Sequence, residues 1–185
     1  MRALFTLACV VGLALAPLPA LAQARLTAEQ RVERAEADLA IRRILVDYAW
    51  YLDHRDIEGY ANLFAKDGQW VNGKIVRKGH EEIRQLLLGL YGPTAADYVN
   101  RDSFHLTTNI EVNVQGDRAT AWSRHLLFKR GPAGRAGPTL AGAYGDGVIR
   151  ENGAWKILKR VDFPVMPTAE EWGKIIAERR KAARQ

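Results

Sequence analysis

The sequence predicts an α+β protein in which a curved, mainly antiparallel sheet wraps around N-terminal helices. The first half of the chain has apolar residues at helical spacing over residues 32–52, 57–64 and 79–90. The second half alternates apolar and polar residues in four segments, at 105–114, 118–129, 140–150 and 154–163. Turn residues between these segments indicate hairpins, so the chain reads as helices followed by a long antiparallel sheet.

The first 22 residues have the features of an export signal. A basic start is followed by an apolar run over residues 3–18, which Pro17 interrupts, and by the small-x-small sequence Ala-Leu-Ala at 20–22. A retained membrane anchor is the competing interpretation, but the run is short for a membrane span and contains a helix breaker. We therefore expect cleavage near residues 22–24, no stable membrane anchor afterwards, and a periplasmic or secreted protein.

The remaining chain of about 160 residues suits one domain. Its only cysteine, Cys9, lies inside the expected signal, so the mature protein has neither a disulfide nor thiol chemistry. Removing the signal lowers the formal net charge from +6 to +5, and the basic excess lies mostly at residues 174–184. This tail reads as a solvated helix face. Without a basic-aromatic motif it gives no support to nucleic-acid binding.

Four parts follow one another along the chain. We expect the signal at 1–22, a polar linker at 23–31, the folded domain at 32–166 and a C-terminal basic helix at 167–185. Inside the domain, Asp56 precedes a new apolar stripe and is expected to cap the second helix. Asn72-Gly73 predicts a hairpin turn. Two segments with glycine and proline, at 91–102 and 131–138, are expected to be loops, the first of them over a pocket.

Asp53 is the residue around which the candidate site is built. Steps of four residues connect it to Ala49, Leu45 and Ile41, so its carboxylate extends an apolar row of the first helix. A buried carboxylate without a partner is costly, which predicts that something pairs with it. An aspartate that bonds backbone groups of the next turn is the alternative, and this stretch alone leaves both interpretations open.

His105 opens the first long strand, in the sequence FHLTTNIEV. It alternates with polar residues and lies opposite an apolar set that includes Leu106 and Ile110. On this pattern His105 belongs to the solvated face of the strand. A bulge or strong curvature would instead turn the first residues of the strand inward.

Three strings in this chain, YAWYLDHRDIEGYANLFAKDGQWV, FHLTTNIEVNVQGDRATAWS and AYGDGVIRENGAWKILKR, resemble the SnoaL-like group of the nuclear-transport-factor-2-like (NTF2-like) superfamily. That superfamily includes polyketide cyclases, scytalone dehydratase, hexachlorocyclohexane dehydrochlorinase and ketosteroid isomerases. The resemblance covers nearly all of the mature chain. It implies a cone-shaped α+β barrel with a cavity between the bent sheet and its helices, usually in a homodimer or homotrimer.

In the dehydratase and dehydrochlorinase members, an aspartate at the end of the first helix pairs with a histidine at the start of the following long strand. The resemblance carries these roles to Asp53 and His105, within an H-x-x-T-N pattern that His105, Thr108 and Asn109 complete. The carboxylate would fix the imidazole tautomer and stabilise the imidazolium formed when the other nitrogen takes a proton. Neither residue needs a metal or a cofactor.

The chain also departs from scytalone dehydratase. Leu52 and Asn72 lie where that enzyme has tyrosines, and its second histidine falls near Ser123. His125, two residues further and on the same strand face, is a candidate general acid, with a structural strand histidine as the alternative. Asp146 is expected to pair with Arg124 or Arg160.

Several other residues are candidates for substrate contact or for the core, because they lie near elements that should face the cavity. Tyr144 is also a candidate donor to an oxyanion. The set is Tyr48, Trp50, Phe64, Trp70, Asn109, Trp122 and Tyr144.

Two functions remain open on the sequence. The first is a cofactor-independent lyase or isomerase, of dehydratase, elimination or carbon-carbon lyase type, that acts on a small apolar cyclic or aromatic molecule through Asp53 and His105. The second is a non-catalytic NTF2-like module that binds a hydrophobic ligand or a protein partner.

Overall fold

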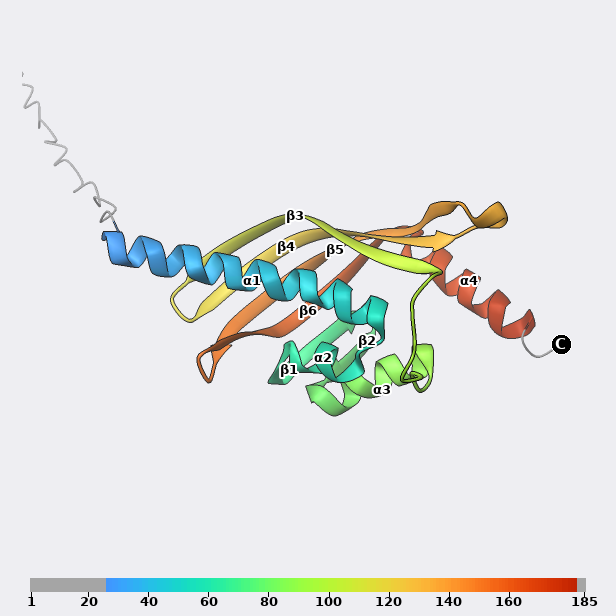
Figure 1. Cartoon of the computed structure of the whole chain (residues 1–185), viewed down its shortest axis with the longest axis horizontal. Helices are drawn as coiled ribbons and strands as arrows, with labels where there is room; N and C mark the ends of the chain where they lie inside the picture. The colour runs from blue at the N-terminus through green and yellow to red at the C-terminus, as the bar shows by residue number, and fades with distance from the viewer. Residues whose placement is uncertain (1–25, 183–185) are drawn as a thin grey trace, which may run out of the picture.

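A computed structural model describes residues 26–182 of the chain, apart from the side chains of a few residues in the last helix. A six-stranded sheet bends around α1 (Ala28–His54), with α2 (Ile57–Asn62) and α3 (Gly79–Tyr91) beside its lower end (Figure 1). The export signal expected at residues 1–22 lies outside the described residues. Among residues 26–182, no helix is long and apolar enough to cross a membrane.

Helix α1 starts earlier than the sequence pattern indicates. Thr27 and Gln30 form a capping box, in which each side chain bonds the backbone N–H of the other residue. Residues 28–31, expected to be linker, therefore form the first turn of the helix. The buried face follows the predicted row through Ile41, Leu45 and Ala49.

The six strands form one sheet in the order β2-β1-β6-β5-β4-β3. Strand β1 pairs with β6 in parallel, and every other pair is antiparallel, so the sheet is mainly antiparallel as predicted. Their bounds are β1 (Phe64–Asn72), β2 (Ile75–Lys78), β3 (Ser103–Gln115), β4 (Arg118–Arg130), β5 (Ala136–Glu151) and β6 (Ala154–Met166).

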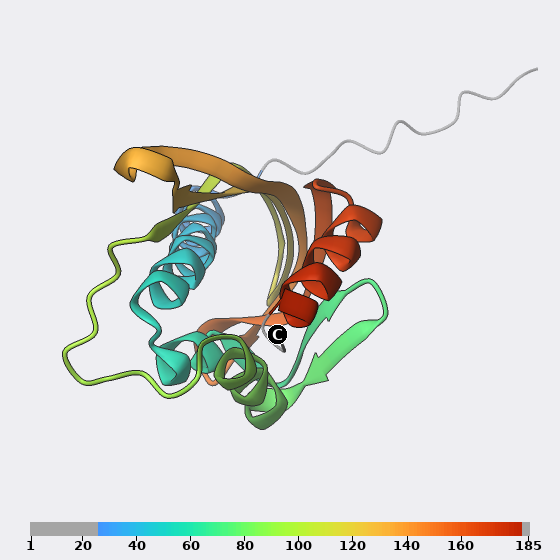
Figure 2. The same cartoon turned by 90° about the vertical axis from the view of Figure 1, so that its right-hand side faces the viewer.

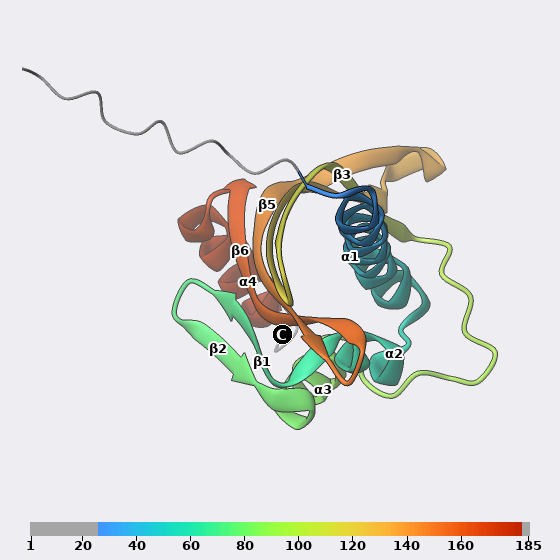
Figure 3. The same cartoon turned by 90° about the vertical axis from the view of Figure 1, so that its left-hand side faces the viewer.

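The sheet has a concave face and a convex face. Figures 2 and 3 show α1 inside the concavity, with α2 and α3 closing its lower side. The last helix, α4 (Ala169–Ala182), follows β6 and lies on the convex side. The expected curved sheet around N-terminal helices is thus confirmed.

A bulge in β3 decides which of its side chains face inward. The register between β3 and β4 shifts between Thr108 and Glu111, and Asn109 has a left-handed φ of 51°. Before the bulge, His105 is on the half-buried face; after it, Ile110 takes over that face. The prediction from uninterrupted alternation, which placed His105 on the solvated face, was wrong. The alternative is confirmed, because the bulge turns His105 inward.

Three local expectations have different outcomes. The Asp56 carboxylate accepts a hydrogen bond from the Gly59 N–H at 2.8 Å, which confirms the predicted cap of α2. The glycine-rich loop expected at 131–138 is shorter, because β5 already begins at Ala136 and pairs with β4. Leu90, the last residue of the apolar helical spacing expected over residues 79–90, is 64% exposed and so does not belong to the buried face of α3.

A buried ion pair lies in the core between β5 and β6. The Arg160 guanidinium donates two hydrogen bonds to Asp146, at 2.7 and 2.9 Å, and both side chains are fully buried. The guanidinium also lies over the rings of Tyr48 and Tyr144, 3.9 and 4.3 Å from their centroids. Burial lowers the pKa of Arg160, but Asp146 outweighs it and raises that pKa overall. Of the two arginines expected for Asp146, the structure uses Arg160.

Candidate active site

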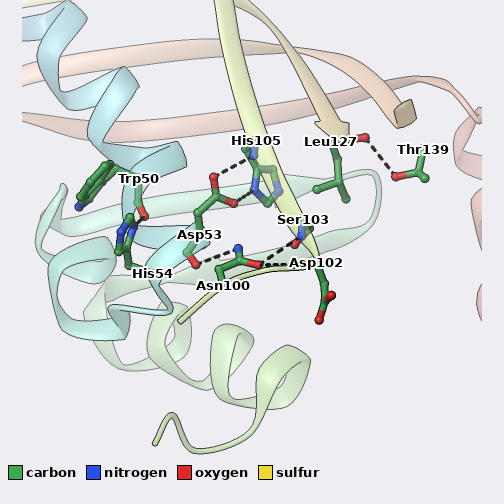
Figure 4. A network of polar contacts seen from close by, with 9 residues as sticks. All are labelled: Trp50, Asp53, His54, Asn100, Asp102, Ser103, His105, Leu127 and Thr139. Carbon is green, nitrogen blue, oxygen red and sulfur yellow. Dashed lines mark hydrogen bonds and ion pairs between the residues drawn. The ribbon is translucent and has the colours of Figure 1, made fainter. Parts of the chain in front are cut away.

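Asp53 and His105 are in direct contact at the wide end of the concave face. His105 Nδ1 lies 2.7 Å from Asp53 Oδ1, and the backbone N–H of His105 donates to Asp53 Oδ2 at 2.9 Å (Figure 4). Each side chain is 16% exposed. The carboxylate therefore holds the imidazole ring and the start of β3 at the same time.

The contact fixes the form of the imidazole. A carboxylate can only accept, so His105 Nδ1 carries the proton of this hydrogen bond. In the neutral ring the other nitrogen, Nε2, is then unprotonated and can take a proton from a bound molecule. This arrangement suits general base catalysis, with Asp53 stabilising the positive charge that forms.

Asn100 ties together the two elements that carry this pair. Its side-chain N–H donates to the backbone carbonyl of Asp53 at 3.0 Å. Its side-chain oxygen accepts from the backbone N–H groups of Asp102 and Ser103, both at 3.2 Å. Figure 4 shows Asn100 between the end of α1 and the start of β3. The loop before β3 therefore positions the strand against the helix.

His105 lines an open pocket of about 330 Å³. Leu90, Tyr91 and Leu127 supply much of its apolar wall. Burial is the main cause that raises the pKa of Tyr91 to about 12, with the nearby Tyr48 phenol and Asp53 carboxylate adding to it. The Tyr91 hydroxyl is thus protonated at neutral pH and can donate a hydrogen bond beside His105.

His125 belongs to a second histidine–aspartate pair. Its Nε2 lies 3.1 Å from Asp162 Oδ1, and the Asn72 side chain donates to the other carboxylate oxygen at 3.0 Å. The ring stacks on Tyr144 and covers Gly142, where a side chain would collide with it. His125 is only 2% exposed and does not line the His105 pocket. Its surroundings fit the structural alternative better than direct contact with a ligand there.

Four of the predicted aromatic residues belong to the core or its edge. Tyr48, Phe64 and Tyr144 are buried in one cluster, and Trp70 packs against it. The Tyr48 hydroxyl accepts hydrogen bonds from the Tyr60 hydroxyl at 2.7 Å and from the Trp70 ring N–H at 3.0 Å. Tyr144 is buried beside these rings and does not line the His105 pocket, so it does not present an oxyanion donor there.

Three predicted contact residues point away from the pocket. Trp50 is 58% exposed and stacks on His54, and both rings lie away from the contact between Asp53 and His105 (Figure 4). Trp122 packs against Phe163 on the convex face of the sheet. Asn109 is the exposed left-handed residue of the bulge and accepts a hydrogen bond from Thr108. The structure therefore does not bring these three side chains to the His105 pocket.

Three residues near the site were not singled out from the sequence. Tyr91 and Asn100 lie in or next to a segment that reads as a loop, and Asp162 lies within β6, a strand of mixed polarity. A tyrosine directly after an apolar helix stripe was the one available signal. Among the described residues, no cluster of three or more histidine, cysteine, aspartate or glutamate side chains could hold a metal ion.

Comparison with solved structures places this geometry in a known fold. The chain is 27% identical to the Mycobacterium tuberculosis protein Rv3472, of unknown function, over 73% of this chain and 75% of that one, with a TM-score of 0.63. A proposed scytalone dehydratase from Novosphingobium aromaticivorans is 25% identical over 73% and 88% of the two chains, with a TM-score of 0.60. LinA is 22% identical over 73% and 90%, also with a TM-score of 0.60, and shows the fold alone.

A comparison with curated proteins found no significant match. A comparison with protein-family models did find one. The model of the SnoaL-like domain matches residues 33–161, which is most of the chain and includes both Asp53 and His105. The chain therefore belongs to the SnoaL-like domain family, with an NTF2-like fold.

Proposed function

We propose that this protein is a cofactor-independent lyase or isomerase that acts on a small cyclic or aromatic molecule by acid-base chemistry. The contact between Asp53 and His105, at the wall of an open pocket, is the observation that carries the proposal. Relatives of the same fold include a proposed scytalone dehydratase and hexachlorocyclohexane dehydrochlorinase, which are lyases by name.

The proposed reaction begins with proton transfer to His105 Nε2 from a carbon or hydroxyl of the substrate. The Asp53 carboxylate stabilises the imidazolium that results, and the electron pair left on the substrate expels a leaving group or moves a double bond. Dehydration, elimination, carbon-carbon cleavage and isomerisation all share this first step.

A second hydrogen-bond donor in the pocket wall completes the proposal. The sequence suggested Tyr144 or His125 for this role, but both are buried away from the pocket. Tyr91 lines the pocket with His105, and burial raises the pKa of its hydroxyl to about 12, so the hydroxyl is a hydrogen-bond donor and a very weak acid at neutral pH. We assign Tyr91 to the leaving group or developing oxyanion.

Deuterium exchange tests this function before the substrate is known. Cyclic alcohols, halides and ketones are incubated with the protein in D₂O, and deuterated or dehydrated products are followed by NMR and mass spectrometry. We expect His105→Gln and Asp53→Asn to lower the rate about 10²- to 10⁴-fold. His54→Gln is the matched control, because His54 is exposed and does not line the His105 pocket. Full turnover by folded His105→Gln would overturn the mechanism.

Binding without catalysis is the second candidate function, and one observation favours it. The convex face of the sheet exposes large apolar side chains at Phe104, Leu106, Trp122, Phe163 and Val165, each at least 40% exposed. A protein partner or a second copy of this chain would cover them. We propose the second copy, as a homodimer or homotrimer in the periplasm or outside the cell.

A further inference from the structure

Two cationic side chains at the mouth of the His105 pocket, Arg55 and Lys129, have no acidic partner among the described residues. Arg55, Lys129 and Asp102 all line the pocket. The Asp102 carboxylate is 83% exposed and pairs with Arg130 at 3.2 Å. Within residues 26–182, neither Arg55 nor Lys129 forms an ion pair. The two cations therefore give the opening a local excess of positive charge.

Aromatic rings hold the Arg55 side chain in place. Its guanidinium carbon lies 4.2 Å from the ring centroid of Tyr98 and 5.1 Å from that of Tyr91. The Thr94 hydroxyl donates to the Arg55 carbonyl at 3.2 Å, which fixes the backbone as well. Within residues 26–182, the guanidinium N–H groups of Arg55 donate no hydrogen bond to another group of the protein, so they are free to donate to a bound molecule. A fixed arginine with free edge donors is preorganised for a planar anion.

The backbone of Arg55 is strained for an arginine. It ends α1 with φ 52° and ψ 33°, a left-handed conformation that glycine or asparagine adopts most easily. A cation in the last turn of a helix interacts as favourably with the helix dipole as one at the position of Arg55. That turn needs no strained backbone, and His54 already lies in it. The dipole therefore does not explain an arginine at this position. Non-glycine residues with a left-handed backbone cluster at functional sites, and Arg55 lines the pocket.

Lys129 reaches the same opening from the sheet. It is directly opposite Ser103 in the pairing of β3 with β4, and His105 is opposite Leu127 two residues further along. Period-two alternation places Lys129, Leu127, Ser103 and His105 on one face. Arg55 enters from the end of α1. The two cations thus approach the pocket from different elements, with the apolar wall and His105 beyond them.

We propose that the substrate carries a carboxylate, which Arg55 binds through its guanidinium edge with Lys129 adding charge. The apolar body of the molecule then lies against Leu90, Tyr91 and Leu127, and its reacting C–H or O–H faces His105 Nε2. A pocket of about 330 Å³ fits a molecule of modest size. The reacting end of this inference rests on the proposed function, whereas the binding of the anion does not.

A screen of matched compounds tests the inference. Cyclic and aromatic carboxylic acids are each paired with their primary carboxamides, and saturation-transfer NMR detects binding at low salt. Amide shifts of His105 and Leu127 report where the compounds bind. The variants are Arg55→Gln and Arg55→Gly, of which the second keeps the left-handed backbone. Arg77→Gln, on the distant β1–β2 hairpin, is the control.

We expect acids to bind and their carboxamides not to bind. For the tightest acid, we expect Kd to rise about 10- to 100-fold in both Arg55 variants and to stay unchanged in Arg77→Gln, with weaker binding at high salt. The inference fails if no acid binds, if carboxamides bind as well as acids, or if the Arg55 variants keep the Kd. The His105→Gln variant separates the two proposals. If this variant keeps both acid binding and full turnover, the proposed reaction is wrong but the anion site is supported.

Discussion

Two buried or half-buried aspartates in this chain have different roles because their partners differ. Asp53 bonds the ring and the backbone N–H of one histidine beside an open pocket. Asp146 bonds a fully buried arginine, far from any ligand that could reach it. A histidine can exchange its proton near neutral pH, but an arginine cannot. The first pair is therefore suited to proton transfer, and the second is suited to holding β5 against β6.

Asp146→Asn tests the structural role of the buried pair. The substitution leaves the Arg160 charge buried without its counter-ion, so we expect the free energy of unfolding to fall by about 3–5 kcal/mol. Urea denaturation of the variant and of the parent protein measures the change.

Asp117→Asn is the matched control for that measurement. Asp117 also pairs with an arginine, Arg150, at 3.2 Å, but its side chain is 80% exposed. We expect a loss of at most about 1 kcal/mol there. Equal losses in the two variants would contradict the role given to burial.

At the scale of elements, strand β3 has to face two ways. Its first half turns His105 toward α1, and its second half turns Ile110 and Val112 toward the same helix. His105 and Ile110 are five residues apart, so strict alternation would place them on opposite faces of the strand. One extra residue between them brings both to the same face. Asn109 is that added residue. The bulge thus allows one strand to supply a polar site and part of the apolar core.

Substitutions at Asn109 measure whether the bulge has this conformation. A β-branched side chain is strained at a φ of 51°, whereas glycine is not. We expect Asn109→Val to lower the free energy of unfolding by about 1–2 kcal/mol, and Asn109→Gly to change it by much less. Chemical denaturation of both variants checks this. A valine variant as stable as the glycine variant would refute the left-handed bulge.

Sequence reasoning predicted most of the elements and the contact between Asp53 and His105 that the structure has. The row from Ile41 to Asp53 identified an inward carboxylate because helical spacing within one element suffices for that. His105 needed the family resemblance, since its alternation alone assigned it to the solvated face. The bulge that reverses this depends on pairing with β4, which no local pattern of β3 reveals.

There is a simpler reason why the side chains of Trp50 and Trp122 do not face the pocket as predicted. Trp122 and His125 have opposite parity on β4, so both could not face the cavity. Trp50 lies one residue after the buried Ala49 and four before the exposed His54, on the outer row of α1. Aromatic character was given more weight than position. Tyr91 was missed because the end of α3 meets the start of β3 only in three dimensions.

At the scale of the whole molecule, the two faces of the sheet have different roles. The concave face holds the helices, the core and the pocket, while the convex face exposes an apolar surface (Figures 2 and 3). Trp122 and Phe163 lie at its centre, in contact with each other over Gly145, where a side chain would crowd both rings. Covering this surface is the physical reason to propose self-association.

A double charge substitution tests self-association. We expect the parent protein, without its signal, to elute as a dimer or trimer in size-exclusion chromatography with light scattering. Trp122→Glu combined with Phe163→Glu should give a monomer, because the two charges would be buried in the contact. Ile75→Glu is the control, as Ile75 is 50% exposed on β2, away from this surface. A monomeric parent, or an unchanged mass in the double variant, would contradict the proposed assembly.

The most direct test of the central claim is the tautomer of the His105 ring, read from ¹⁵N chemical shifts at neutral to mildly alkaline pH. The contact with Asp53 predicts a protonated Nδ1 and a free Nε2 in the neutral ring, and Asp53→Asn should weaken this preference. His125 serves as an internal reference of opposite sense, because its Nε2 faces Asp162. A neutral His105 with its proton on Nε2 would mean that no base faces the pocket, and the acid-base account would then be wrong.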